Sequence, residues 1–111
     1  MPDSKLIETS FAVAVNMTAG ELDQWLASPE SLAVGWKGSN EEREESVGHS
    51  SGRQVLQILR KRNADLSESD YAHMRKVVGF VKRHLAQRPD NMVTSRWRYS
   101  LMNWGHDPLK D

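Results

Sequence analysis

The sequence contains no cysteine. A disulfide therefore cannot stabilise the fold, and no thiolate is present to act as a nucleophile or a metal ligand. Stability must come from packing, and 111 residues are enough to bury one modest hydrophobic core but too few for two. We therefore expect a single domain spanning residues 1–111, in a reducing compartment.

Long apolar runs are also absent. No stretch approaches the roughly 20 apolar residues that span a bilayer. Residues 1–4 lack the basic start and apolar stretch of a signal peptide. We therefore expect no membrane partner and a cytoplasmic location, with association with the nucleoid if the protein binds DNA.

A net charge is lacking as well, because 15 Lys and Arg residues balance 15 Asp and Glu residues. The balance conceals a division along the chain. Residues 1–52 hold three basic and nine acidic residues, a net charge of −6, whereas residues 53–111 hold twelve basic and six acidic residues, a net charge of +6. Such a division predicts a basic surface that faces a polyanion, unless the two halves pair with each other within the fold.

Motifs of catalysis and cofactor binding are missing. The sequence contains no nucleophile motif, Walker loop, dinucleotide fingerprint or HExxH motif. The acidic run at residues 41–45 is flanked by glycine and serine, which cannot hold paired carboxylates at a fixed separation. We therefore expect no enzymatic activity, no cofactor and no metal.

Four histidines are the remaining candidates for a metal ligand or a general base. His73 and His84 share one helical face but lie eleven residues apart, about 16 Å along the axis, too far to hold one ion. They are expected to have packing or capping roles. His49 and His106 each follow a glycine beside a predicted helix end, where a side chain can bond free backbone groups. A site formed by His49, His106 and Asp107 requires that the fold bring these segments together.

The spacing of apolar residues predicts an all-α fold, a compact single-domain bundle of about five helices. Residues 5–15 fit a short helix imperfectly and could also form a strand. Thr18 and Glu21 have the spacing of a capping box and predict a helix start. Pro29 is expected to end that helix, with one more short turn at residues 31–36.

The second half of the chain predicts the longer helices. Residues 37–50 are predicted to form a flexible acidic loop, followed by an amphipathic helix from residue 50 or 51 to about residue 62. The longest helix is predicted at residues 67–87, because Ser67 and Asp70 can cap its start. Its core stripe consists of Tyr71, Met74, Val77, Val78, Val81 and Leu85. A last helix at residues 95–104 should end at Gly105.

The helix at residues 67–87 also carries the main candidate for ligand binding. Opposite its core stripe, Ala72, Gly79 and Ala86 recur every seven residues and form a band without bulky side chains. Its two edges are basic and consist of Arg75 and Lys82, and of Lys76 and Arg83. A phosphate backbone could approach the band while the cations reach around it. Alternatively, a neighbouring helix packs on the small residues and the cations form a solvated rim.

Other cations form a second group of candidates, namely Arg60, Lys61, Arg62, Arg96 and Arg98. The first three end a predicted helix, where positive charge also suits the helix dipole. The last two alternate with Trp97 and Tyr99, whose rings could stack on bases. In the alternative interpretation, Trp97 and Trp104, which are seven residues apart on one helical face, pack in the hydrophobic core.

Several stretches carry a family resemblance, namely residues 14–18, 46–49, 51–53, 71–78, 82–87 and 100–107. They resemble those of a family of short bacterial and fungal proteins of uncharacterised function, whose members are commonly labelled "DNA-binding protein". The resemblance extends from about Phe11 to Lys110. It implies a compact helical unit and an association with DNA, and it brings no catalytic residues with it.

Together these observations predict a non-catalytic protein that binds nucleic acid, most simply duplex DNA through its phosphate backbone. No helix-turn-helix, zinc-finger or RNA-binding sheet pattern points to sequence readout. The alternative is a protein–protein interaction module whose acidic and basic halves contact each other or a partner. If the protein binds nucleic acid, the cations should share a face that no carboxylate covers. If it is an interaction module, Glu21, Asp23 or the acidic run should cover that face.

Overall fold

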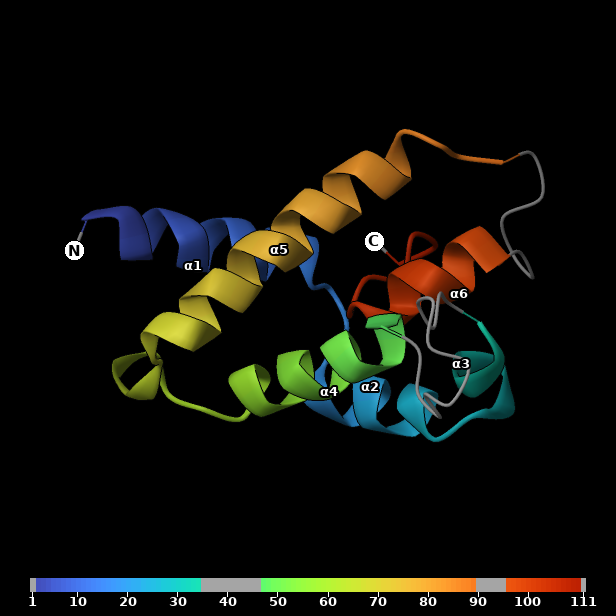
Figure 1. The fold of residues 1–111 in the computed structure, drawn as a ribbon, viewed down its shortest axis with the longest axis horizontal. Coiled ribbons are helices and arrows are strands. Elements are labelled where there is room, and N and C mark those ends of the chain that lie inside the picture. The colour runs from blue at the N-terminus through green and yellow to red at the C-terminus, as the bar shows by residue number, and fades with distance from the viewer. Residues whose placement is uncertain (1, 35–46, 90–95, 111) are drawn as a thin grey trace.

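Six α-helices and one 3-10 turn make up the described part of the chain (Figure 1). The computed structural model describes residues 2–34, 47–89 and 96–110. The elements are α1 (Pro2–Ala14), α2 (Ala19–Leu26), α3 (Pro29–Ala33), α4 (Val47–Leu59), η1 (Asn63–Asp65), α5 (Glu68–Leu85) and α6 (Arg96–Asn103). These described ranges contain no strand, so the predicted all-α class is confirmed, and residues 5–14 of the segment predicted at 5–15 belong to a helix.

Two of the helices begin at the capping boxes that the sequence predicts. The Thr18 hydroxyl accepts a hydrogen bond from the Glu21 backbone N–H at 3.1 Å, and the Glu21 carboxylate accepts one from the Thr18 N–H at 2.8 Å. Ser67 and Asp70 make the same reciprocal pair at 3.1 and 3.0 Å. Each pair satisfies backbone donors that have no partner within the helix, which explains why α2 and α5 start where they do.

The region around Pro29 differs from the prediction. Pro29 follows the end of α2 and is the first residue of α3. Proline fits there because the backbone N–H of the first helical residue has no partner within the helix. The Ser28 hydroxyl caps this start by accepting from the Ser31 N–H at 3.2 Å. The short turn predicted at residues 31–36 is therefore a helix at Pro29–Ala33, and residues 35 and 36 lie outside the described residues.

Helix α4 begins earlier than predicted, at Val47 instead of residue 50 or 51, and ends at Leu59 instead of residue 62. Gly48, Ser51 and Gly52 disfavour a helix, but all three are buried, so packing outweighs their low propensity. Residues 47–50 of the predicted loop are thus helical, and residues 37–46 lie outside the described part. Helix α5 ends at Leu85, two residues before the predicted end.

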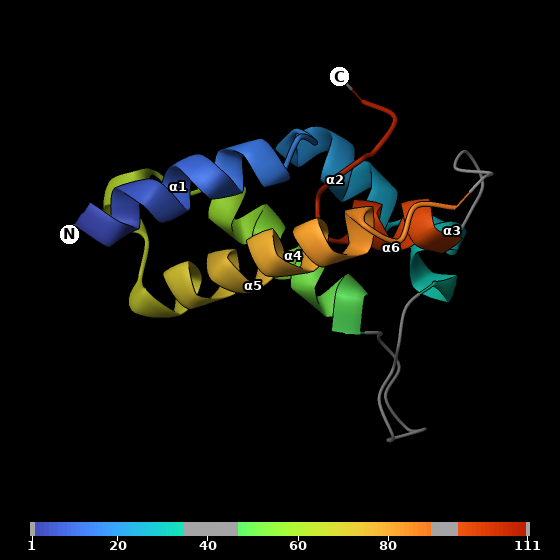
Figure 2. The same ribbon diagram turned by 90° about the horizontal axis from the view of Figure 1, so that it is seen from above.

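The longest described helix, α5, is also central. It packs along α1 and contacts α4 and α6. Figure 2 shows α1 and α5 side by side. Helices α2, α3 and α6 gather at the opposite end of the molecule from the start of α1 (Figure 1).

One hydrophobic core joins these helices. Its buried members include Phe11, Val15, Met17, Leu22, Leu26, Val55, Ile58, Met74, Val77, Val81 and Leu101. Trp97 and Trp104 pack against it, as the core interpretation predicted. Leu85 was predicted to be core but is 38% exposed, because it lies in the last turn of α5 and lines an open depression between α5 and α1. Within the described ranges, no helix combines the length and the apolar character needed to cross a membrane.

Candidate nucleic-acid interface

The outward face of α5 carries four exposed cations, Arg75, Lys76, Lys82 and Arg83. They fall within an arc of about 120°, and the two pairs lie about 10.5 Å apart along the helix axis. Within the described parts of the chain, none of the four forms an ion pair. Their charge is therefore not neutralised by any described carboxylate.

The band of small residues between these cations is exposed at its two ends and is crossed by a side chain in its middle. Ala72 and Ala86 are exposed. A Cβ atom added at Gly79 would meet a guanidinium nitrogen of Arg83 at 3.1 Å, and the three nearest atoms all belong to that side chain. The Arg83 side chain thus lies across the band at Gly79. In the alternative interpretation, a neighbouring helix would pack on the band there.

Two of the carboxylates that were expected to compete for this face are engaged elsewhere. Glu21 pairs with Lys110, and Asp23 pairs with Arg60 at 3.3 Å. The hydrogen bond from Lys110, together with that from the Thr18 backbone, lowers the pKa of Glu21 to about 2. Residues 41–45 lie outside the described part of the chain. Exposed Glu68, in the first turn of α5, lies at the N-terminal end of the same face.

The second group of cations behaves differently, because four of its five members form ion pairs within the chain. The pairs are Arg60–Asp23 at 3.3 Å, Lys61–Asp70 at 2.7 Å, Arg62–Asp65 at 3.1 Å and Arg98–Asp107 at 3.2 Å. Arg96, at the start of α6, is exposed. The hydrogen bond from Lys61 is the main reason that the pKa of Asp70 lies below its ordinary value. Arg60–Asp23 links the basic half of the sequence to the acidic half.

Two histidines bond free carbonyls at the ends of helices distant in sequence, and His49 does so from within α4 instead of from beside a helix start. The ring of His49 bonds the Leu26 carbonyl at 2.8 Å, and the ring of His106 bonds the Ala14 carbonyl at 2.7 Å. Leu26 and Ala14 are the last residues of α2 and α1, where carbonyls lack an intrahelical donor. Asp107 instead bonds Arg98, and the described residues contain no group of three potential metal ligands. His49, His106 and Asp107 are therefore not brought together as a metal site.

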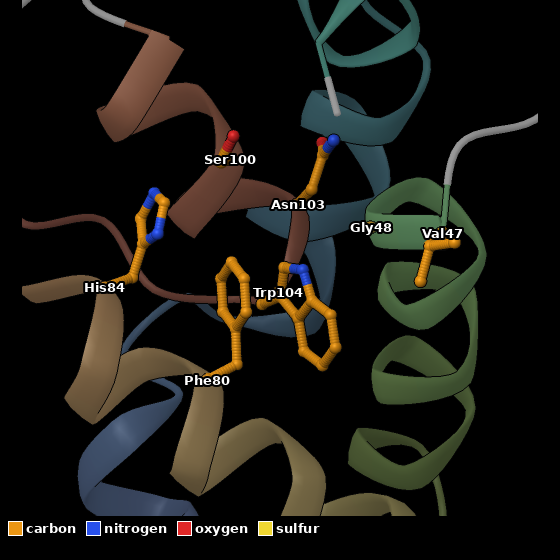
Figure 3. A pocket seen from close by; sticks show the side chains of 7 residues that line it. All are labelled: Val47, Gly48, Phe80, His84, Ser100, Asn103 and Trp104. Atoms are coloured by element: carbon orange, nitrogen blue, oxygen red, sulfur yellow. The ribbon is translucent and has the colours of Figure 1, made fainter. Parts of the chain in front are cut away.

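A pocket of about 350 Å³ opens between α4, α5 and α6 (Figure 3). One side of it is a stack of rings, with centroids 4.2 Å apart for Trp104 and Phe80 and 4.9 Å apart for Phe80 and His84. His73 and Trp97 extend the stack at its two ends. The sequence signal for it is the spacing of seven and four residues that puts His73, Phe80 and His84 on one face of α5.

His84 is the titratable member of the pocket lining. Burial lowers its pKa below the ordinary value of 6.5, which favours the neutral ring. Its buried Nε2 atom has no hydrogen-bond partner among the described residues. The other lining residues are apolar, aromatic or neutral, so they supply no second acid or base beside His84.

Two of the stretches that carry the family resemblance, residues 51–53 and 100–107, meet where α4 packs on α6. The fully buried Asn103 side chain accepts hydrogen bonds from Trp25 Nε1 at 2.7 Å and from the Ser31 hydroxyl at 2.5 Å. A Cβ atom at Gly52 would lie 2.3 Å from the Asn103 carbonyl oxygen. The sequence does not reveal this polar junction, because an asparagine in a helix gives no local sign that it is buried. These residues have a structural role there.

Comparison with known proteins gives a family and no further relatives. The DUF3140 family, described as "Protein of unknown function", matches residues 10–102, which include all nine candidate cations. No curated protein matches the chain, and no solved structure does. The family description names no ligand and no reaction. Because the match covers most of the sequence, the chain belongs to the DUF3140 family.

Proposed function

We propose that this protein binds duplex DNA without catalysis, through phosphate contacts from Arg75, Lys76, Lys82 and Arg83. The contrast between the two groups of cations carries the proposal. The four side chains on α5 have no ion pair among the described residues, whereas four of the other five have one. A paired cation gives up an existing interaction when it neutralises a phosphate, and the cations of α5 give up none within the described chain.

The shape of the α5 face supports backbone contact rather than base readout. Ala72, Gly79 and Ala86 form a band without bulky side chains along about four turns of helix, and cations flank it on both edges, with Arg83 reaching across it at Gly79. Contacts of this kind position a protein on DNA but carry no sequence information. We therefore expect strong dependence on salt and weak dependence on sequence.

The test is a fluorescence-anisotropy titration of a labelled duplex at several salt concentrations. The variant with Arg75, Lys76, Lys82 and Arg83 all changed to Ala should bind on the order of 100-fold more weakly at low salt. Its plot of log affinity against log salt should also be shallower, by up to about 0.9 for each phosphate contact removed. Circular dichroism checks that the variant remains folded.

The matched control changes Arg60, Lys61 and Arg62 together to Ala. This variant also loses clustered positive charge, but from cations that are paired within the chain. It should keep most of the wild-type affinity for DNA. The proposal is overturned if the wild-type protein does not bind at low salt, or if the control variant loses as much affinity as the α5 variant.

A further inference from the structure

An apolar groove runs between α1 and α5, beside the face that we propose binds DNA. It consists of two adjoining depressions. The larger, of about 370 Å³, has Val13 and Leu85 in its lining, and the smaller, of about 190 Å³, has Leu6. Both are also lined by Ser10 and Val78, so the two depressions lie next to each other along the seam between α1 and α5. The core of the protein leaves this groove unfilled.

The apolar side chains along the groove are unusually exposed for their type. Val13 is 75% exposed, Leu6 is 68% exposed and Leu85 is 38% exposed. Scattered exposed apolar residues are ordinary, but these three line one seam, and apolar patches of that kind mark interaction sites. Leu6 and Val13 lie seven residues apart and hence on one side of α1, about 10.5 Å from each other along the axis. The groove thus has the length of about two helical turns.

One rim of the groove is positively charged. Arg75 lines the smaller depression and Lys82 lines the larger, and these cations too are seven residues apart on one side of α5. Glu8 on α1 accepts a hydrogen bond from the Tyr71 hydroxyl at 2.9 Å, and no described carboxylate pairs with Arg75 or Lys82. An apolar floor therefore lies beside an uncompensated basic edge.

We propose that this groove binds an acidic amphipathic helix of a partner protein. Apolar residues at positions i, i+3 or i+4, and i+7 of that helix fill the two depressions, which is how helices are recognised in grooves. Carboxylates seven residues apart face Arg75 and Lys82, and this charge pairing sets the direction of the bound helix. A second copy of the chain fits poorly, because apposing two such grooves brings like charges together.

The probe is a labelled synthetic helical peptide with Leu at i, i+3, i+4 and i+7 and Glu at the flanking positions, used with an analogue in which Lys replaces each Glu. Anisotropy should show that the acidic peptide binds the wild-type protein at least about tenfold more tightly than the basic analogue does. The double variant Val13→Ser with Leu85→Ser should lose most of this binding. Both positions are exposed, so the variant is expected to fold.

Two variants separate this proposal from DNA binding. Lys76→Ala with Arg83→Ala changes the edge of α5 away from the groove, so it should weaken DNA binding and leave peptide binding unchanged. Val13→Ser with Leu85→Ser should do the reverse. The groove proposal fails if neither peptide binds, if both bind equally, or if the serine variant keeps wild-type affinity for the acidic peptide. It also fails if sedimentation shows a wild-type dimer that the serine variant dissociates, because a second copy is then the occupant.

Discussion

His73 and His84 illustrate how burial changes a single side chain. Both lie in the ring stack that joins α5 to α6, and burial lowers the pKa of each below the ordinary value of 6.5. His73 also bonds the Ser51 hydroxyl at 2.9 Å. The fold therefore favours the neutral form of both rings, and their protonation acts against the native state.

Acidification below pH 6.5 is expected to destabilise the protein. Unfolded histidines bind protons there while the folded ones remain neutral, so the unfolded state holds more protons. The free energy of unfolding should fall as the pH falls from 6.5 through the lowered pKa values. Urea unfolding at about pH 7.5 and about pH 5.5, followed by tryptophan fluorescence, measures this change. The double variant His73→Gln with His84→Phe should show a clearly smaller pH dependence, and an unchanged one would contradict the assignment.

The contact between α4 and α6 depends on the absence of one side chain. Gly52 is buried in α4, and a Cβ atom there would lie 2.3 Å from the Asn103 carbonyl oxygen and 2.7 Å from a Leu26 methyl carbon. A backbone oxygen cannot move aside without moving α6. Gly20 in α2 differs, because a Cβ atom there would meet nothing within 4 Å.

The same substitution at these two glycines should have opposite effects. Gly52→Ala is expected to lower the free energy of unfolding by about 2–3 kcal/mol, because it forces the two helices apart. Gly20→Ala is expected to raise it by about 0.5 kcal/mol, because alanine reduces the conformational freedom of the unfolded chain. Urea denaturation of both variants gives the comparison. A Gly52→Ala protein as stable as wild type would show that α4 and α6 are not in such close contact.

Asn103 connects three helices of the whole molecule. Asn103 is the last residue of α6, and its side-chain oxygen accepts hydrogen bonds from Trp25 on α2 and Ser31 on α3. Its amide nitrogen donates to the Ser31 carbonyl at 3.2 Å. The side chain is completely buried. Its loss leaves buried donors without an acceptor, which costs more than the hydrogen bonds themselves contribute.

Asn103→Ala is expected to lower the free energy of unfolding by about 2–4 kcal/mol. A double-mutant cycle with Trp25→Phe tests the cause. In the Trp25→Phe background one unsatisfied donor is already gone, so Asn103→Ala should cost about 1 kcal/mol less. Strictly additive losses would mean that the indole–amide bond does not couple α2 to α6.

The candidate interface could be predicted only in part. All nine cations were identifiable from the charge division of the sequence, but their pairing was not. Arg60 and its partner Asp23 are 37 residues apart in the chain, and Arg98 meets Asp107 only because the chain turns back after α6. Local patterns carry no information on such pairs, so the distinction between paired and unpaired cations required the fold.

Short-range interactions explain what was predictable about the fold. The caps at Thr18 and Ser67 bond residues three positions away, and the core stripe of α5 repeats with the helical period, so both can be identified from neighbouring residues. Contacts between distant residues decided the rest. Burial of Gly48 and Gly52 lets α4 begin at Val47, and the course of α1 along α5 leaves Leu85 and Val13 in an open groove. Such features depend on which helix surfaces meet, and that is a property of the packed molecule.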